Sequence, residues 1–418
     1  MADSLTPSGT VDTPASAGSL YSALRGGRWL DRRRVVGYGV ALLVFEILAF
    51  CVAVVATHGW VVPLDEPTTT DFASFYAAGV LANAGTPGLA YDAVRHFAVE
   101  HQVTGGANYQ FFFYPPVYLL ICAGLARLPY LAAFILFEAA TAALYLVVAR
   151  RILGEKDGVA TIVLLAFPAV FWTIGLGQNS LLTAALFGAA TLLVDRRPLL
   201  AGLLFGALCY KPHVGLLIPL ALAGGGRWRC FCAAAASASL LLLLSVWLFG
   251  LETWIDFLRA VTTAPDTYQS GRISLVAMIS PFGAVRLMGG SPVLAYGAQL
   301  AAVAAVAGIV AVIWRLRLSE PVRAAALAAA APIAMPVALI YDMMLAGIAM
   351  AWLARAARAT GFLPWEKTAL LGLFGGALLS FTLSGPLHFP FALLSLLGLL
   401  AVIVARARWE LARAREPA

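Results

Sequence analysis

Long apolar runs separated by short basic turns constrain this chain more than any other feature of its sequence. The first run, residues 37–61, follows a cluster of five arginines between residues 25 and 34. A run of about 20 apolar residues can cross a hydrocarbon core about 30 Å thick. Charged residues make up only 12% of the chain, whereas soluble domains carry about 25%. The sequence therefore predicts an all-α fold, that of a polytopic integral membrane protein.

The basic turns predict how the chain crosses the membrane. Basic residues that flank apolar runs stay on the cytoplasmic side. This rule gives about 12 transmembrane helices, cytoplasmic termini and a large first extracytoplasmic loop at residues 62–113. Runs between residues 181 and 224 are shorter than about 20 residues, so we expect tilted, broken or buried helices there. The short run 117–127 fits either a full crossing or a half-helix that turns back.

Composition divides the chain into three parts. Residues 1–35 form a tail rich in Ser, Thr and Pro that ends in the basic cluster, and we expect it to be disordered and cytoplasmic. Residues 36–405 form the membrane domain, and residues 406–418 form a second basic cytoplasmic tail. The net charge of +7 does not indicate a nucleic-acid partner, because the arginines lie at the ends of apolar runs. The five irregularly spaced cysteines predict neither a disulfide framework nor a zinc site.

One acid-led segment, DFASFYAAG at residues 71–79, stands just beyond the first apolar run. Its carboxylate, Asp71, fits two roles that one residue can combine: the N-cap of a helix at the interface, or the lip of a site at the membrane face. The stretch 89–102 has helical apolar spacing and is expected to lie along the interface. Aromatic residues at 109–114 mark a membrane–water boundary, and Pro115–Pro116 predicts that a new helix begins there.

Polar groups from several separate segments fall on the same predicted membrane face as Asp71. They are Tyr114, Gln178, Asn179, Lys211, His213, Arg272, Tyr341 and Asp342. Each has an ordinary structural interpretation, because a lysine can snorkel, amides can join helices and a Tyr-Asp pair can cap a helix. The alternative is a site in which a lysine binds phosphate and amides hold sugar hydroxyl groups. A protein that only spans a membrane does not need so many polar groups at one face, which favours a site.

Six segments in order resemble glycosyltransferase family 87, a family of the GT-C class that includes polyprenyl-phosphate-mannose-dependent mannosyltransferases. The segments are DFASFYAAG (71–79), AYDAVRHF (90–97), FFYPPVYLL (112–120), GLGQNSLLTAAL (175–186), DRRPLLAGLLFGALCYKPHVGLLIPLAL (195–222) and IYDMMLAGIAMAWLAR (340–355). The resemblance extends roughly over residues 70–405, which is nearly the whole chain. One departure is that the family often has a His shortly before the Tyr-Asp pair, whereas residues 335–340 contain none.

The resemblance implies a membrane enzyme that moves a hexose, with mannose favoured, or a pentose from a polyprenyl monophosphate donor. The resemblance also implies that transfer takes place on the extracytoplasmic face of the cytoplasmic (inner) membrane, with inversion at the anomeric carbon, to a lipid or glycan acceptor. Asp71 matches the general base of the family, and Lys211 and Arg272 are the candidates for binding the donor phosphate. The candidate substrate-binding residues are Tyr76, Tyr114, Gln178, Asn179, His213, Tyr341 and Asp342. No cofactor or metal ligand is implied, and dependence on a divalent ion stays open.

A transporter or flippase of a lipid-linked intermediate is the alternative function. Two acids inside predicted spans, Glu46 and Glu138, are typical of proton coupling, and the short helices near 181–224 are typical of transporters. Against it, the sequence shows no internal repeat, and its polar groups gather at one face rather than at the midplane. We therefore interpret Glu46 and Glu138 as a hydrogen-bonded structural pair.

Overall fold

The computed structural model describes residues 17–56, 70–106, 109–154, 158–269 and 274–415, and every regular element in them is helical. The predicted all-α class is therefore confirmed. The α-helices are α1 (Ala17–Gly26), α2 (Arg32–Ala56), α3 (Asp71–Asn83), α4 (Ala93–Thr104), α5 (Pro116–Leu125), α6 (Tyr130–Leu153), α7 (Gly158–Leu165), α8 (Pro168–Leu176), α9 (Ser180–Leu193), α10 (Pro198–Ala207), α11 (Ile218–Gly224), α12 (Trp228–Phe249), α13 (Leu251–Gln269), α14 (Pro281–Leu287), α15 (Pro292–Arg315), α16 (Glu320–Ala334), α17 (Met344–Thr360), α18 (Glu366–Leu387) and α19 (Phe391–Arg413). The 3-10 helices are η1 (Pro87–Tyr91), η2 (Leu208–Tyr210), η3 (Pro212–Gly215), η4 (Leu275–Ala277) and η5 (Ile340–Met343).

Six helical segments in the described chain are long and apolar enough to cross a membrane. They are α2, α6, α12, α15, the continuous segment Ile340–Thr360 and α19. The pair α7–α8 passes the same test only as one broken span, bent by 60°. The bend precedes Pro168, which lacks an N–H and disfavours helical backbone in the residue before it. The predicted total of about twelve spans is therefore not confirmed.

Short helices occur where short apolar runs were predicted. Helices α9, α10 and α11 contain 14, 10 and 7 residues. Helix α5 begins at Pro116, as the double proline predicted, and has only 10 residues. Because a helix rises about 1.5 Å per residue, α5 covers about half of a hydrocarbon core. This length favours the interpretation of residues 117–127 as a half-helix.

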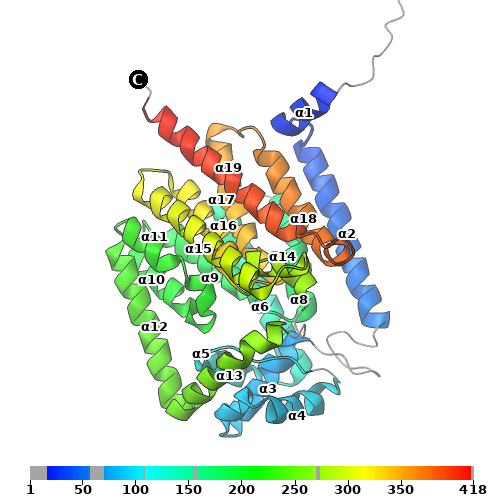
Figure 1. Ribbon diagram of the computed structural model, residues 1–418, viewed down its shortest axis with the longest axis vertical. Helices are drawn as coiled ribbons and strands as arrows, with labels where there is room; N and C mark the ends of the chain where they lie inside the picture. The colour runs from blue at the N-terminus through cyan, green and yellow to red at the C-terminus, as the bar shows by residue number, and fades with distance from the viewer. Residues whose placement is uncertain (1–16, 57–69, 107–108, 155–157, 270–273, 416–418) are drawn as a thin grey trace, which may run out of the picture.

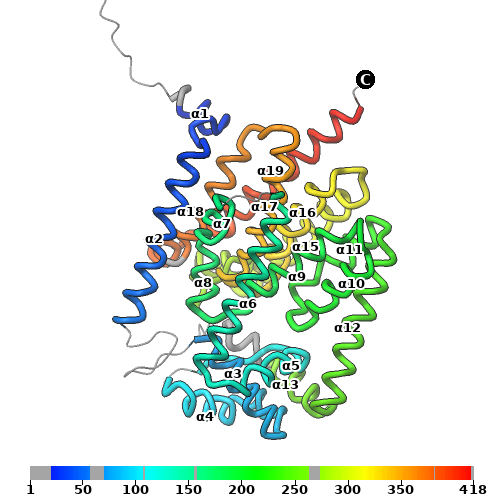
Figure 2. The backbone as a smooth tube through the Cα atoms, turned by 180° about the vertical axis from the view of Figure 1, so that it is seen from behind, coloured from blue at the N-terminus to red at the C-terminus, as the bar shows by residue number. Residues whose placement is uncertain are grey.

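One end of the molecule is formed by α3, which begins with Asp71, and by the helices packed around it. Figures 1 and 2 show α3, α4, α5 and α13 together at the lower end, whereas α1 and the C-terminal end of α19 lie at the upper end. Helices α2 and α12 run along opposite flanks in both views. The centre is formed by α16, in which every residue from Val322 to Ala334 is buried, and by α17 packed against it. Most of these α16 residues are alanine, and small side chains allow close helix packing in a membrane.

Part of the tail that was expected to be disordered is helical, since residues 17–26 form α1 and residues 32–35 form the first turn of α2. Glu46 and Glu138 are both buried, but neither carboxylate oxygen of Glu138 has a hydrogen-bond partner. A hydrogen-bonded pair of these two acids is therefore excluded in this structure.

Helix α3 is held by a close crossing with α5. A Cβ atom added at Gly79 would lie 2.0 Å from the backbone oxygen of Cys122. At the other end of α3, the Phe72 ring packs edge-on against the rings of Tyr130 and Phe134, with centroids 5.4 Å away in each case. These contacts fix the position of the first turn of α3, and so of Asp71.

We expect Gly79→Ala to destabilise the fold by about 1–3 kcal/mol, because the added methyl group overpacks the α3–α5 crossing. The measurement is the free energy of unfolding in detergent micelles. Gly124→Ala is the matched control on α5, since a Cβ there meets no atom within 4 Å. Equal stability of Gly79→Ala and Gly124→Ala would contradict the packing described.

Candidate functional site

Asp71 is the first residue of α3, and the residue in the cap position is Thr70. The interpretation of Asp71 as the N-cap is therefore wrong, although a carboxylate in the first turn still interacts favourably with the helix dipole. The carboxylate of the half-buried Asp71 accepts a hydrogen bond from Gln178, with 2.6 Å between Nε2 and Oδ2. The Asp71 carboxylate thus hydrogen-bonds to a residue distant in the chain rather than to the N–H groups of its own helix.

Gly177 is the residue that brings Gln178 to Asp71. It ends α8 in the left-handed region at a φ of 67°, where a side chain is strained. A Cβ atom at this position would also lie 2.5 Å from the Cβ atom of Phe72. Only glycine therefore allows the turn between α8 and α9 to approach the first turn of α3 so closely.

Gln178 is a buried hub with partners at both ends of its amide. Nε2 donates to Asp71, while Oε1 accepts from the Tyr114 hydroxyl and from the Asn179 backbone N–H, at 3.2 Å each. The backbone oxygen of Tyr114 in turn accepts from the Tyr91 hydroxyl at 2.9 Å. Because both ends of the amide are engaged, its orientation is fixed, and Nε2 faces the carboxylate.

A buried ion pair lies beside this hub. Lys211 and Asp342 are each 3% exposed, and 2.5 Å separates Nζ from Oδ1. Asp342 also accepts from the Ser180 hydroxyl and from the Leu339 backbone N–H, at 3.1 Å each. The Tyr341 ring lies below the ammonium, with its centroid 5.2 Å from Nζ. Lys211 therefore does not snorkel, and Asp342 combines a role at the start of η5 with an ion pair.

The two clusters meet at the first turn of α9, since Gln178, Asn179 and Ser180 are consecutive. Burial raises the pKa of Asp71 to about 6, although the Gln178 hydrogen bond and the positive charge of Lys211 both act to lower it. A carboxyl group with this pKa is mostly ionised at neutral pH and is a stronger base than an exposed carboxylate. Asp71 therefore has the protonation behaviour that a general base requires.

Asn179 is fully buried, and neither atom of its side-chain amide has a hydrogen-bond partner. The hydroxyl groups of Tyr114 and Tyr118 lie beside this amide and interact with it, although neither is placed for a regular hydrogen bond to it. Buried polar atoms are nearly always paired in native structures. These unpaired atoms therefore mark a place where the hydroxyl groups of a ligand could bind.

Other expected site residues lie apart from the hub or outside the described chain. The Tyr76 hydroxyl donates to the Leu128 backbone oxygen at 2.8 Å, and its ring packs on Tyr130. His213 is half-buried and follows Lys211 across Pro212. Arg272 lies outside the described residues. Tyr76 therefore helps to fix α3 against the loop before α6, and its hydroxyl donates there rather than to Gln178.

Several residues that complete the site were missed at the level of sequence. They are Tyr91, Tyr118, Gly177 and Ser180. Ser180 directly follows the Gln178–Asn179 pair, and Gly177 directly precedes it. A glycine followed by three polar residues between two apolar segments is a turn signal. This signal could have indicated both Gly177 and Ser180.

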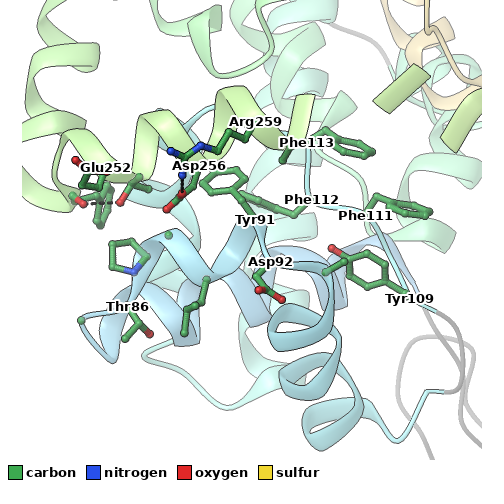
Figure 3. Close-up of a pocket in the computed structure, with 18 residues that line it drawn as sticks. Thr86, Tyr91, Asp92, Tyr109, Phe111, Phe112, Phe113, Glu252, Asp256 and Arg259 are labelled. Atoms are coloured by element: carbon green, nitrogen blue, oxygen red, sulfur yellow. Dashed lines mark hydrogen bonds and ion pairs between the residues drawn. The ribbon is translucent and has the colours of Figure 1, made fainter. Parts of the chain in front are cut away.

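A cleft of about 860 Å³ lies between α13 and the segments that include η1 and residues 109–113 (Figure 3). Its lining includes Tyr91, the residue that bonds to Tyr114, and the neighbouring Phe112. Helix α13 borders the cleft with Glu252, Asp256 and Arg259, and Asp256 and Arg259 form an exposed ion pair at 3.3 Å. The remaining aromatic and acidic residues labelled in Figure 3 are Asp92, Tyr109, Phe111 and Phe113. Within the described chain, no group of three or more His, Cys, Asp and Glu side chains is placed to hold a metal ion.

We expect removal of one member of the buried ion pair to be costly. Asp342→Leu leaves the Lys211 ammonium buried without a counter-charge and should reduce stability by about 3–5 kcal/mol. The double variant Lys211→Met/Asp342→Leu should recover most of this loss, as measured by unfolding in micelles. Arg259→Met, which breaks the exposed pair with Asp256, is the control and should cost at most about 1 kcal/mol. A double variant that is no more stable than Asp342→Leu would contradict a direct, buried pair.

Comparison with known proteins assigns the family. No curated protein and no solved structure matched this chain. A family model described as "Glycosyltransferase family 87" matches residues 112–339. The matched region exceeds half of the chain and contains Tyr114, Gln178 and Lys211, whereas Asp71 and Asp342 lie on either side of it. This multi-helix membrane protein therefore belongs to glycosyltransferase family 87.

Proposed function

We propose that this glycosyltransferase moves a sugar, with mannose favoured, from a polyprenyl monophosphate donor to a lipid or glycan acceptor. Its site faces the extracytoplasmic side of the cytoplasmic membrane, and the anomeric configuration inverts. The observation that carries this proposal is the Asp71 carboxylate, oriented by Gln178 at 2.6 Å and next to the buried Lys211–Asp342 pair. A base and a cationic group close together are what transfer from a phosphate donor requires.

The proposed reaction is a single displacement. As the acceptor oxygen attacks the anomeric carbon, its proton passes to a carboxylate oxygen of Asp71. The bond between the anomeric carbon and the phosphate oxygen breaks, and polyprenyl phosphate leaves with the electron pair. Because the protonated Asp71 has a pKa of about 6, it releases its proton to water again at neutral pH.

Lys211 is the proposed contact for the donor phosphate. Its ammonium has three donors, and one of them binds Asp342. Since Asp342 offsets the charge, the pair would orient a phosphate mainly by hydrogen bonding. Arg272 is kept as the second phosphate ligand in this proposal. Asn179, His213 and Tyr341 are proposed to line the path of the sugar.

The cleft in Figure 3 is the proposed binding place of the acceptor. Aromatic rings offer flat apolar faces to a sugar ring, and carboxylates accept hydrogen bonds from sugar hydroxyl groups. The cleft provides both through Tyr91, Phe113, Asp92 and Glu252. A series of hydrogen bonds, from Tyr91 through Tyr114 and Gln178, connects the lining of this cleft to Asp71.

Transport of a lipid-linked intermediate is the second candidate. The observation that favours it is Glu138, a buried acid in the span α6 with two unpartnered carboxylate oxygens. Intramembrane acids often belong to proton pathways. Counterflow of a labelled lipid-linked sugar in proteoliposomes, without any covalent product, would support transport instead of transfer.

Asp71→Asn should lower the rate of sugar transfer by about 10²–10⁴, because the amide cannot accept the proton. The assay uses purified protein in detergent, radiolabelled polyprenyl-phosphate mannose and a membrane lipid extract, followed by a panel of other polyprenyl-phosphate sugars. Asp31→Asn is the control, since Asp31 lies ahead of α2, far along the chain from the site, and Asn caps a helix equally well. Full activity of a folded Asp71→Asn variant would rule out the proposed base.

The pH profile should report the ionisation of Asp71. With a pKa of about 6, kcat/KM should fall about tenfold per pH unit below that value, because only the ionised form accepts a proton. Gln178→Leu removes a hydrogen bond that stabilises the carboxylate, so the pKa of Asp71 and the acid limb should both move to higher pH. An acid limb at the same pH in wild type and Gln178→Leu would contradict this coupling.

A further inference from the structure

Helix α4 carries two buried titratable side chains, His96 and Glu100, that the proposed reaction does not use. Figures 1 and 2 both show α4 beside α3, and the two helices pack together. Both side chains are buried completely, whereas glutamate almost never is unless it is paired. Because α3 begins with Asp71, this pair lies against the helix that carries the proposed base.

His96 connects α4 to the first part of α3. Its Nε2 lies 3.1 Å from the backbone oxygen of Ser74, which is three residues after Asp71. A carbonyl oxygen only accepts hydrogen bonds, so Nε2 must carry a proton and donate it. The imidazole ring also packs against the rings of Tyr109 and Phe112, with centroids 5.6 Å and 5.8 Å away. These contacts hold the ring in one orientation and join α4 to α3 about one turn from Asp71.

Glu100 faces the other nitrogen of the ring. Its Oε1 lies 3.3 Å from Nδ1 of His96, and neither atom has another hydrogen-bond partner among the described residues. Its Oε2 accepts from the backbone N–H of Gln110 at 3.0 Å. Because Nε2 carries the proton of a neutral ring, Nδ1 of that ring has only a lone pair. Two acceptors would therefore face each other unless the pair binds one more proton.

One additional proton makes this pair uncharged overall. Either a protonated Glu100 donates to the neutral ring, or a cationic ring donates to the carboxylate. Burial raises the pKa of Glu100 to about 8, and the charge of Asp71 adds to this rise while the N–H bond from Gln110 opposes it. Burial also lowers the pKa of His96 to about 4, against the hydrogen bond to Ser74. Both shifts favour the form in which Glu100 is protonated.

The pair is near enough to the proposed base for charges to interact. Among the described residues, the titratable groups that interact with the charge of Glu100 are Asp71 on α3, Tyr109 before α5 and Tyr130 at the start of α6. The two phenols are uncharged at neutral pH. An ionised Glu100 would place a second negative charge near the Asp71 carboxylate and would leave Nδ1 without a donor. A protonated Glu100 avoids both effects.

We propose that His96 and Glu100 are positioning residues for sugar transfer, because the proton they share joins α4 to α3 and keeps Glu100 uncharged near Asp71. This inference rests on the proposed function, in which Asp71 is the base. When Glu100 loses the proton to water at higher pH, the pair becomes anionic and its hydrogen bond is replaced by repulsion between two acceptors. The pair therefore sets an alkaline limit to activity, separate from the acid limit that Asp71 sets.

The first test is the pH profile of sugar transfer by the purified full-length protein. Since the pKa of Glu100 is about 8, kcat/KM of the wild type should fall above that pH. Glu100→Gln should remain active at neutral pH and lose this alkaline fall, because its amide donates to Nδ1 at every pH and still accepts from Gln110. The matched control is Glu410→Gln at the far end of α19, where Glu410 accepts from Ser319, and it should keep the wild-type profile.

The second test needs neither donor nor acceptor, so it separates this inference from the proposed function. Between pH 6.5 and pH 8 the folded pair keeps one proton, whereas the unfolded pair, with ordinary pKa values of 6.5 for His and 4.5 for Glu, keeps none. The pair should therefore lower the folding equilibrium constant by up to about tenfold per pH unit over this range. Unfolding in micelles should show that Glu100→Gln loses this dependence and that Glu410→Gln keeps it.

A third variant, His96→Phe, keeps an aromatic ring against Tyr109 but removes both hydrogen bonds of the imidazole. It should lower kcat by about 10–10²-fold at every pH, because Asp71 loses its fixed position. Glu100→Gln with the alkaline fall and the stability slope of the wild type would overturn the proposal. Loss of the slope with an unchanged pH profile would also overturn it, since the pair would then only stabilise the fold. Absence of sugar transfer by the wild type, with the slope present, would contradict the proposed function and not the shared proton.

Discussion

The hydrogen bond between Gln178 and Asp71 is the contact on which the candidate site depends. It joins residues that are 107 positions apart in the chain. The first turn of α3, which packs against α5, must therefore lie in contact with the turn between α8 and α9. Gly177 allows the turn to approach, and Gly79 allows α3 to approach α5. Loss of either close approach would separate the carboxylate from the amide that orients it, without removing any group that takes part in the proposed chemistry.

The buried Lys211–Asp342 pair has a different physical character. Taking two charges out of water is costly, and well-packed apolar residues at the same positions are often equally stable. Such a pair is therefore weak evidence for a role in stability alone. The pair lies beside Ser180, two residues from Gln178, and the positive charge of Lys211 acts on the pKa of Asp71. This position is compatible with the phosphate contact proposed for Lys211.

The sequence predicted local features more reliably than contacts between distant segments. The helix start at Pro116 and the short helices between residues 181 and 224 were predicted correctly, since proline and run length act locally. The bend before Pro168 follows from the same proline rule but was missed, because hydropathy over residues 158–176 is uninterrupted. The count of spans depends on how short helices pair, which run length does not determine.

Most residues of the candidate site were predictable from the sequence, but the contacts between them were not. Asp71, Gln178, Tyr114, Lys211 and Asp342 were all singled out, and the structure brings them into two adjoining clusters. Their pairing was not predictable, because Lys211 and Asp342 are 131 positions apart and their contact arises from packing. Tyr76 was also singled out, but its hydroxyl donates to the backbone oxygen of Leu128 and not to another residue of the site. No sequence pattern distinguishes a tyrosine with this structural role from one that contacts substrate.

In the proposed single displacement, Asp71 acts as a base and never as a nucleophile. The most direct measurement is the anomeric configuration of the transferred sugar, determined by NMR on the purified product and compared with that of the donor. Base catalysis by one carboxylate predicts complete inversion. Retention would require another mechanism, such as two displacements through a covalent intermediate, and it would contradict the role assigned to Asp71.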